Sequence, residues 1–320
     1  MSEELKKIAT RDGFGEEILK LGLENPEIMI VDADIGKSCK TGAFRKELSA
    51  EYHEDKNQYV NVGIAEQNAA GVAAGLATCG KIPFVVTYAV FGSLRMCEMI
   101  RQEICYTNLN VKIACSHGGV TPANDGASHQ AIEDIAIMRA ITGLSVFSPC
   151  DQYETKAVID YVASHDGPCY VRLGRSQVED FFTADTDFDV TKINVLRQGS
   201  QKIAVFATGL MVQSSMKAAE ILAEKGVNLT VIDVCAIKPC DEEGITNILK
   251  ENETIFTVEE HSITGGLGSL VAELASAKCP RFVHRLGMYG YAESASAEVL
   301  LHEYRLDGEG VAEQILGYLK

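Results

Sequence analysis

The chain has 320 residues, of which 46% are hydrophobic and 23% are charged, and its formal net charge is −16 at pH 7. This composition is typical of a globular protein, and the length exceeds that of a usual single core, so we expect two domains. The acidic charge argues against nucleic acid and anionic membranes as partners, because both require a basic surface. An anionic substrate must therefore be held by a few locally placed Arg, Lys and His side chains.

The start of the sequence contains no apolar signal segment, and no stretch has 18 uninterrupted apolar residues, so we expect no membrane span. The ten cysteines are scattered, without a CxxC pair or a His partner at zinc spacing. Reduced thiols in a cytoplasmic protein are the simplest interpretation of this cysteine usage.

Apolar runs alternate with helical patterns along the first 175 residues. This alternation predicts an α/β fold in which a mostly parallel sheet is covered by helices on both faces. One predicted helix consists largely of small residues and is expected to end at Gly80. The predicted strands cover residues 27–36, 82–91, 111–119, 144–150 and 169–175, and the predicted helices cover residues 66–80, 93–106, 131–141 and 151–165.

An acidic and irregular segment over residues 176–200 is interpreted as a linker. The alternation of strands and helices resumes after this segment and predicts a second, smaller α/β domain. We therefore expect two domains, residues 1–185 and 186–320, each built on a mostly parallel sheet flanked by helices. The segments predicted for the second domain are strands over 202–209, 228–239 and 281–288, a helix over 211–226, and a strand followed by a helix within 254–277.

Polar and aromatic residues gather where the predicted strands of the first domain end. Ligands of open α/β sheets bind at this edge, so the clusters together predict a binding pocket. One carboxylate stands apart, because Glu66 opens a helix made of glycine, alanine and small apolar residues. The clusters are Asp32, Asp34 and Ser38; Glu66; Tyr88 and Phe91; His117, Asp125 and His129; and Arg172 and Arg175.

Each cluster taken alone also has a purely structural interpretation. Asp125 before Gly126 is ordinary turn chemistry, Asp34 fits a helix cap, and Tyr88 and Phe91 fit a hydrophobic core. Taken together, two histidines and an aspartate on one glycine-rich loop favour the binding of hydroxyls and anions.

Six stretches carry a resemblance to a known family. With these six stretches, which occur in the family's order along the chain, the sequence resembles the C-terminal half of transketolases and related thiamine-diphosphate enzymes. The resemblance is closest to the separately encoded C-terminal subunit of split transketolases. The stretches are "DADIGKS", "VGIAEQNAAGVAAGLA", "TYAVFGSLRMCEMIR", "SHGGVTPANDGASHQAIEDIAIMRA", "GPCYVRLGR" and "VEEHSITGGLGS".

The resemblance implies thiamine diphosphate as the cofactor and gives roles to the matching residues. Glu66 matches a glutamate that hydrogen-bonds a ring nitrogen of the cofactor's aminopyrimidine. A dry setting of small residues raises the pKa of such an acid, so that it can share a proton with this nitrogen. His117 and His129 match residues that bind hydroxyls and relay protons, so they join Glu66 as predicted catalytic residues. The predicted cofactor-binding residues are Asp34, Glu66, Tyr88 and Phe91, and the predicted substrate-binding residues are Arg11, Ser38, His117, Asp125, His129, Arg172 and Arg175.

The choice of the phosphate-binding arginine at the end of the last strand stays open between Arg172 and Arg175, because this stretch is longer than the usual transketolase form. The loop also departs from the family pattern at Asn124, where an acidic residue is common, and at Ser128, where threonine is common. Substrate choice is therefore less firmly implied than the cofactor.

The family holds the cofactor's diphosphate and Mg²⁺ through a Gly-Asp-Gly motif followed by an asparagine, and this sequence contains no Gly-Asp-Gly. We therefore predict no metal ligand in this chain. The resemblance implies a separate diphosphate-binding subunit and a heterotetramer with two copies of each chain. The second domain of this chain is then expected mainly to support contacts between copies.

The implied activity is transfer of a two-carbon ketol unit from a ketose phosphate to an aldose phosphate. Three alternatives remain. The first is a transketolase for a sulfonated or branched ketose, because anion selection depends on few side chains. The second is the β subunit of a 2-oxo-acid dehydrogenase E1, against which the "DGASHQ" loop argues. The third is a non-catalytic paralogue, which retention of Glu66, His117, Asp125 and His129 disfavours.

Overall fold

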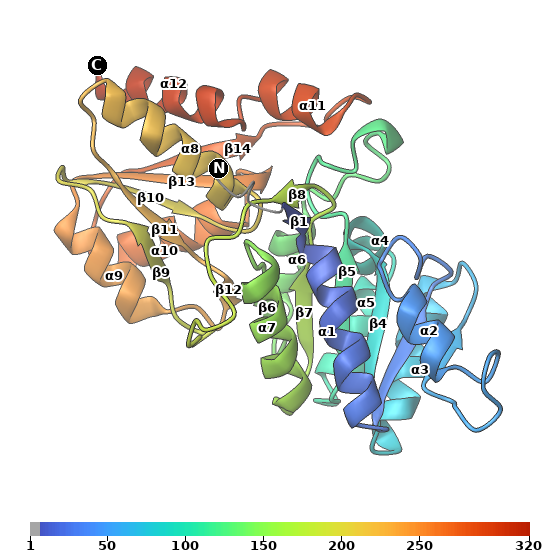
Figure 1. Cartoon of the computed structure of the whole chain (residues 1–320). Helices are drawn as coiled ribbons and strands as arrows, with labels where there is room; N and C mark the ends of the chain where they lie inside the picture. Colours follow the sequence, from blue (N-terminus) through green and yellow to red (C-terminus); the bar gives the residue numbers. More distant parts are fainter. Residues whose placement is uncertain (1–6) are drawn as a thin grey trace.

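The computed structural model describes residues 7–320 and contains two α/β units, each built on its own sheet (Figure 1). The first six residues of the predicted first domain lie outside this description. The first sheet has seven strands, and every pair except the one at the β12 edge is parallel. In spatial order its strands are β12 (Ala236–Lys238), β6 (Ser145–Phe147), β7 (Cys169–Arg172), β5 (Lys112–Ser116), β4 (Ile82–Tyr88), β2 (Ile28–Asp32) and β3 (Tyr59–Asn61).

Helices cover both faces of this sheet because the strands are apolar on both faces. Ile30 of β2 packs on the side of α1 and α7, whereas its neighbour Val31 packs on the side of α3, α4 and α6. Figure 1 shows α1 and α7 side by side across the strands. The helical segments are α1 (Thr10–Glu24), α2 (Gly42–Leu48), α3 (Glu66–Thr78), α4 (Ala89–Leu94), α5 (Cys97–Met99), the π-helix η1 (Ile100–Cys105), the 3-10 helix η2 (Ala123–Asp125), α6 (Asp134–Ala140) and α7 (Gln152–Ser164).

Helix α3 shows how small residues set the packing distance. Ala69, Ala70, Ala73 and Ala74 are its buried residues, so the helix backbone comes close to the sheet. Gly80 has φ +82° directly after the helix, and its amide donates to a carbonyl of the last turn. The predicted stop at Gly80 is therefore confirmed, because this left-handed conformation suits glycine.

The region after β4 differs from the prediction. The strand expected over 82–91 ends at Tyr88, so Phe91 lies in α4 rather than at the end of a strand. The single helix expected over 93–106 is divided into α4, α5 and the π-helix η1. Gly92 allows α4 to pack directly on β5, because a Cβ at this position would overlap Cys115 Sγ.

The helix predicted over 131–141 begins only at Asp134. The residues of the expected first turn are not helical, because Ala131 forms two backbone hydrogen bonds with Gly119. These bonds hold the two ends of the preceding loop together.

The second sheet has five strands, which are parallel except for the pair that β9 makes with β11. Two strands lie inside the segment interpreted as a linker, since β9 joins this sheet and β8 pairs with β1. In spatial order the sheet contains β14 (Val283–Met288), β13 (Thr254–Ser262), β10 (Ile203–Ala207), β11 (Thr230–Asp233) and β9 (Asn194–Arg197); the separate ribbon is β1 (Ile8–Ala9) with β8 (Gln177–Val178); and the helices are α8 (Met211–Glu224), α9 (Glu242–Glu251), α10 (Leu267–Lys278), α11 (Ala297–Glu303) and α12 (Gly308–Leu319).

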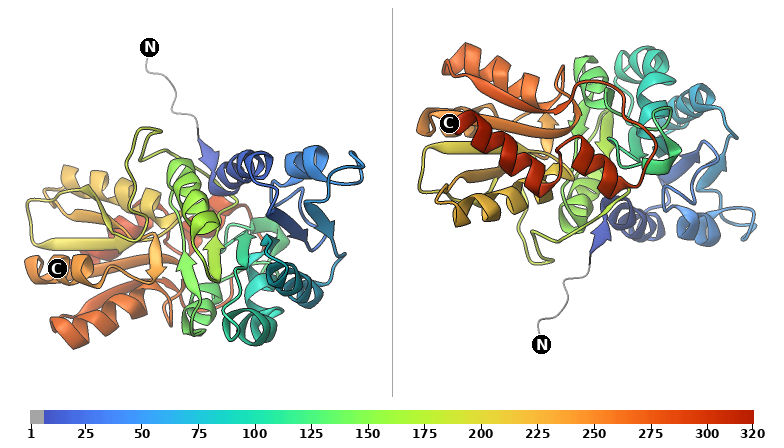
Figure 2. Two further views of the ribbon diagram at one scale, coloured as in Figure 1. Left: turned by 90° about the horizontal axis from the view of Figure 1, so that it is seen from below. Right: turned by 90° about the horizontal axis from the view of Figure 1, so that it is seen from above.

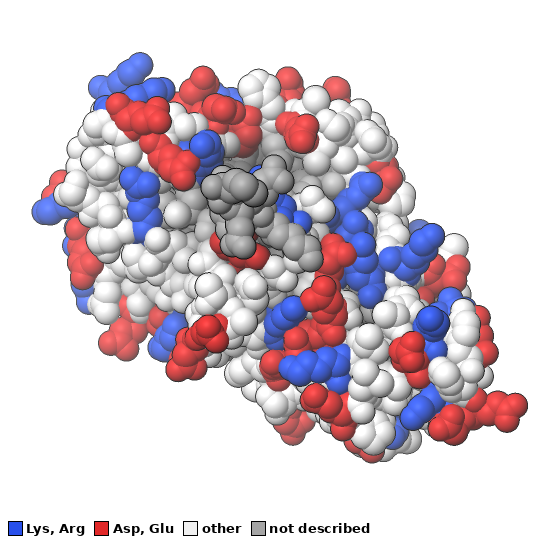
Figure 3. All heavy atoms as spheres, viewed as in Figure 1, with Lys and Arg blue, Asp and Glu red and all other residues white. Residues whose placement is uncertain are grey.

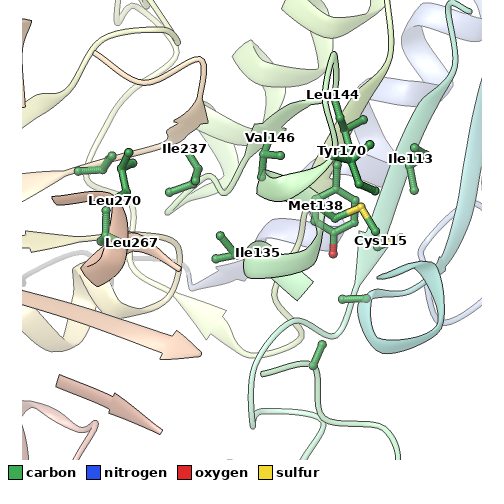
Figure 4. Packing of buried hydrophobic residues seen from close by; sticks show 14 of the residues in the cluster. Ile113, Cys115, Ile135, Met138, Leu144, Val146, Tyr170, Ile237, Leu267 and Leu270 are labelled. Carbon is green, nitrogen blue, oxygen red and sulfur yellow. The ribbon is translucent and has the colours of Figure 1, made fainter. Parts of the chain in front are cut away.

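The two units share contacts that a simple boundary does not describe. The strand expected over 228–239 is two strands in different sheets, because β12 leaves the second unit and pairs with β6 of the first. One hydrophobic cluster extends from Ile113 and Tyr170 of the first sheet to Leu267 and Leu270 of α10 (Figure 4). Figure 2 shows the two units side by side in two further views. Among residues 7–320, no helix is long and apolar enough to cross a membrane.

Candidate active site

The carboxyl ends of four neighbouring parallel strands bring most of the predicted site residues to one edge of the first sheet. His117 directly follows β5, Tyr88 ends β4, Asp34 follows β2, and Glu66 begins α3 shortly after β3. With about 4.8 Å between neighbouring strands, the row spans roughly 14 Å. The edge is therefore long enough for a ligand with several functional groups.

His117 is buried and held on both sides of its ring. Its Nδ1 lies 2.7 Å from Ser116 Oγ, and its Nε2 lies 3.3 Å from Arg11 Nη1. A guanidinium only donates, so Nε2 accepts from Arg11 and Nδ1 carries the proton that is donated to Ser116. Burial, reinforced by the charges of Arg11 and Arg175, lowers the pKa of His117 to about 3. His117 is therefore a neutral hydrogen-bond acceptor at its Nε2 atom.

Two aromatic rings form a wall beside the histidines. The rings of Tyr88 and Phe91 are stacked, with their centroids 6.1 Å apart and their planes inclined by 18°. The His117 ring lies 3.9 Å from that of Tyr88, and the His129 ring approaches Phe91 edge-on at 5.4 Å. All four rings are thus brought together, and the half-buried Tyr88 and Phe91 offer aromatic surface to a flat ligand.

A pocket of about 320 Å³ is lined by Arg11, the hydrogen-bond partner of His117. Its lining is mainly basic but also includes Asp12 and Glu16. Arg11 and Arg175 both line it, and burial lowers the pKa of Arg11, although the neighbouring Asp12 opposes the shift. Lys40 also lines it but is paired with Asp12 at 2.8 Å. On the face of the molecule seen in Figure 3, acidic and basic side chains are interspersed. Two arginines at one opening suit an anionic group such as phosphate.

Ser38 and Asp125 contact these two arginines in ways that the sequence did not specify. Ser38 accepts from Arg11 Nη1 through its backbone carbonyl at 3.1 Å rather than through its hydroxyl. Asp125 is exposed, and its carboxylate lies 3.7 Å from Arg175 Nη1. The tip of the loop is therefore linked to the basic pocket.

Comparisons with known proteins identify the family to which the chain belongs. Residues 6–180 match the family described as transketolase, pyrimidine binding domain, and residues 191–311 match transketolase, C-terminal domain. The chain belongs to the transketolase family. A protein named as a transketolase C-terminal section in Methanocaldococcus jannaschii is 41% identical, over 97% of this chain and 96% of that one.

Two further relatives of this transketolase-family chain are subunits of enzymes with named sugar substrates. The 6-deoxy-6-sulfo-D-fructose transketolase subunit of Clostridium sp. is 34% identical over 87% of this chain and 84% of its own length. One subunit of the apulose-4-phosphate transketolase of Phocaeicola vulgatus is 36% identical over 98% of both chains.

Solved structures give the same architecture. A split gene transketolase, solved as an inactive β4 tetramer, superposes with a TM-score of 0.85 at 40% identity and 98% coverage of both chains. The transketolase of Campylobacter jejuni has a TM-score of 0.83 at 20% identity, and the match covers 98% of this chain but 47% of that one. The transketolase-family fold is thus shown over nearly the whole chain.

Arg172 is buried inside the protein, whereas Arg175 lines the pocket. Arg172 Nε donates to Asp134 Oδ2 at 2.8 Å, and its Nη2 donates to the carbonyls of Ala131 at 3.1 Å and Glu260 at 2.9 Å. The side chain is 6% exposed. This geometry does not support the prediction that Arg172 binds substrate, because the side chain is buried and its Nε and Nη2 donate inside the protein. The two arginines are three residues apart at the same strand end, so the sequence alone did not separate them.

Glu66 and Asp34 occupy the more open end of the row. Glu66 is half-buried and the nearby Ile64 is 81% exposed, so the expected dry setting does not exist within residues 7–320. Asp34 is exposed, with φ +67°, and accepts from Asn61 Nδ2 at 2.9 Å, so it is not a helix cap. This end of the row is therefore open to solvent among the residues that the structure describes.

Sequence reasoning missed two residues that shape the site. Ser116 accepts the Nδ1 proton of His117 and holds the ring, and its position directly before the histidine in "CSHGG" is the only signal. Asn61 orients Asp34 and also accepts from the amide of Gly63 at 2.8 Å. Nothing in the local pattern marked Asn61, because its partner is 27 residues away.

Proposed function

We propose that this chain is the pyrimidine-binding subunit of a thiamine-diphosphate-dependent transketolase. The observation that carries the proposal is the convergence of Glu66, the Tyr88–Phe91 wall and His117 on one sheet edge, in a chain of the transketolase family. The proposed partner is a separate chain that binds the diphosphate and Mg²⁺, because this sequence has no Gly-Asp-Gly motif. Relatives named as a C-terminal section or as a subunit support this division.

The residues present fit an aminopyrimidine ring. Tyr88 and Phe91 provide a stacked aromatic surface, and Gly63 leaves open space near Glu66, because a Cβ on this glycine would meet nothing within 4 Å. Glu66 lies at the amino-terminal end of α3, where the helix dipole stabilises a carboxylate. In the complex, the partner's surface is expected to dry this end and let Glu66 share a proton with a ring nitrogen.

Thiamine diphosphate, when bound, supplies the nucleophilic carbon that carries a two-carbon ketol unit from a ketose phosphate to an aldose phosphate. The chain's own residues bind and orient the sugars. His117 accepts from a sugar hydroxyl at Nε2 once Arg11 turns toward the anion, and His129 and Asp125 bind further hydroxyls. Arg11 and Arg175 hold the terminal anion.

A second candidate is a ketose with a different anion or carbon skeleton. Relatives named for 6-deoxy-6-sulfo-D-fructose and for apulose 4-phosphate are 34% and 36% identical to this chain. A pocket built on Arg11 and Arg175 accepts a sulfonate as well as a phosphate, because both present several oxygens to the guanidinium groups.

The test is a tagged pull-down from the source cells with thiamine diphosphate and Mg²⁺ present. We expect an equimolar partner that carries the Gly-Asp-Gly motif, in an assembly with two copies of each chain. The complex is then assayed with xylulose 5-phosphate and ribose 5-phosphate, with a sulfonated ketose, and with pyruvate. Decarboxylation of pyruvate without ketol transfer, or cofactor-dependent transfer by this chain alone, would contradict the proposal.

A further inference from the structure

The loop that carries the predicted hydroxyl-binding residues is attached to the second domain as well as to the first. This recognition loop, defined as residues 117–132, connects β5 to α6 of the first domain. Figure 1 shows it reaching toward α11, and the right view of Figure 2 shows the segment before α11 extending across to the first domain. The contacts lie at three places along the loop.

The first place is the base of the loop, next to His117. Thr121 Oγ1 donates to Glu260 Oε1 at 3.3 Å, and the Glu260 side chain is fully buried on β13. Gly119 has φ +76°, and a Cβ there would overlap the Glu260 carboxylate. The second domain therefore touches the loop backbone two residues beyond His117. Burial raises the pKa of Glu260 to about 8, so its neutral acid is a sufficient partner for Thr121.

The second place is hydrophobic. Val120 and Ile132 are both buried, and they pack in the same cluster as Val205, Phe256 and Leu286 of the second sheet. The amide of Ser262 also donates to the carbonyl of Ile132 at 2.7 Å. The two ends of the recognition loop thus belong to the core of the second domain.

The third place is the tip, which contains Asp125 and His129. Ser294 Oγ donates to the carbonyl of Asn124 at 2.7 Å, and the side-chain amide of Gln130 donates to the carbonyl of Glu293 at 3.0 Å. The first bond holds the backbone directly before Asp125, and the second holds the side chain of the residue directly after His129. Both bonds come from the segment between β14 and α11, which belongs to the second domain.

We propose that the second domain positions the recognition loop, and that Ser294 and the Thr121–Glu260 pair are positioning residues for sugar binding. This inference rests on the proposed function only in assigning sugars to the loop. It gives the second domain a role in substrate affinity, beyond the contacts between copies that the sequence led us to expect. The positioning residues are not catalytic, because they act through the backbone of the loop.

The first test uses hydrogen exchange of the free chain and needs no activity. Ser294→Ala is expected to speed exchange of the amides over residues 123–130, and Ser294→Thr, which keeps a hydroxyl, is expected to restore protection. Ser296→Ala is the matched control, because Ser296 caps α11 and accepts from the amide of Val299 instead. Equal exchange in Ser294→Ala and Ser296→Ala would overturn the role of Ser294.

The second test measures kinetics of the complex with its diphosphate-binding partner. Loss of one such hydrogen bond is expected to raise the KM for the donor sugar about 3- to 10-fold in Ser294→Ala and Thr121→Val, with kcat little changed. Glu260→Gln keeps an acceptor for Thr121 and is expected to behave as wild type. A lower kcat with unchanged KM in these variants would refute positioning. If the wild-type complex transfers no ketol unit, the proposed function fails, whereas the exchange experiment still decides the anchoring.

Discussion

Substitution of the two arginines at the end of β7 is expected to have different effects: loss of Arg172 should lower stability, and loss of Arg175 should weaken substrate binding. Arg172→Met leaves Asp134 buried without its cationic partner, which costs about 3–5 kcal/mol. At about 2–4 °C per kcal/mol for a unit of this size, Tm should fall by about 6–20 °C. Arg175→Met breaks a half-exposed pair with Asp125 and a partly buried hydrogen bond to the carbonyl of Pro122, which together contribute about 1–2 kcal/mol, so Tm should fall by about 2–8 °C.

In kinetic measurements on the complex, Arg175→Met should have a larger effect than Arg172→Met. A charge-assisted bond to a phosphate contributes about 1.5–3 kcal/mol, so Arg175→Met should raise the KM of a phosphorylated donor about 10- to 100-fold. A donor without phosphate serves as the control, because its KM should barely change. The reasoning is refuted if Arg175→Met destabilises the chain as much as Arg172→Met, or if Arg172→Met raises KM while Tm is unchanged.

Three further predictions concern single residues of the same edge. Glu66→Gln should lower turnover of the complex by about 10²–10⁴-fold, as expected for loss of a proton-holding group, and proton exchange at the cofactor's reactive carbon should slow in parallel; wild-type turnover would exclude the role. The pKa of His117 falls from its ordinary value of 6.5 to about 3, so the unfolded state binds a proton first as pH falls. Wild-type stability should therefore decline more steeply than that of His117→Gln between about pH 7 and pH 4, and parallel Tm profiles would contradict this. Gly119→Ala should destabilise the chain more than Gly80→Ala, because both have positive φ but only Gly119 faces the Glu260 side chain; equal losses in a denaturant titration would show that the close approach costs nothing.

Local sequence patterns predicted where the strands end, and therefore where most of the candidate site residues lie. His117, Tyr88 and Asp34 were placed correctly because each follows or ends an apolar run, and parallel strands bring such positions to one edge. Long-range partners were not predictable in this way. Arg172 and Arg175 look equivalent in sequence, and only the positions of Asp134 and Glu260, 38 and 88 residues away, distinguish them.

The same limit explains the errors in the fold. The apolar run over 228–239 has the pattern of one strand, but its second half pairs with β6 of the first sheet. The sequence after Tyr88 has a helical pattern almost throughout, but the structure divides this region into α4, α5 and η1. The close packing of Gly92 on Cys115 lies in this region and has no signal in helix propensity. Local periodicity indicates which segments are buried but not the surface against which they are buried.

The two ends of the site edge differ in what encloses them. At the β5 end, the second domain of this chain packs against the recognition loop through Glu260, Val120 and Ser294. At the β3 end, Ile64 is exposed and Glu66 is half-buried, so nothing in residues 7–320 dries the carboxylate. Under the proposed function, hydroxyl recognition is therefore built within this chain, whereas the setting that lets Glu66 share a proton exists only after assembly. Such a division would keep a lone subunit from activating the cofactor, because desolvation of Glu66 and binding of the diphosphate both depend on the partner's surface.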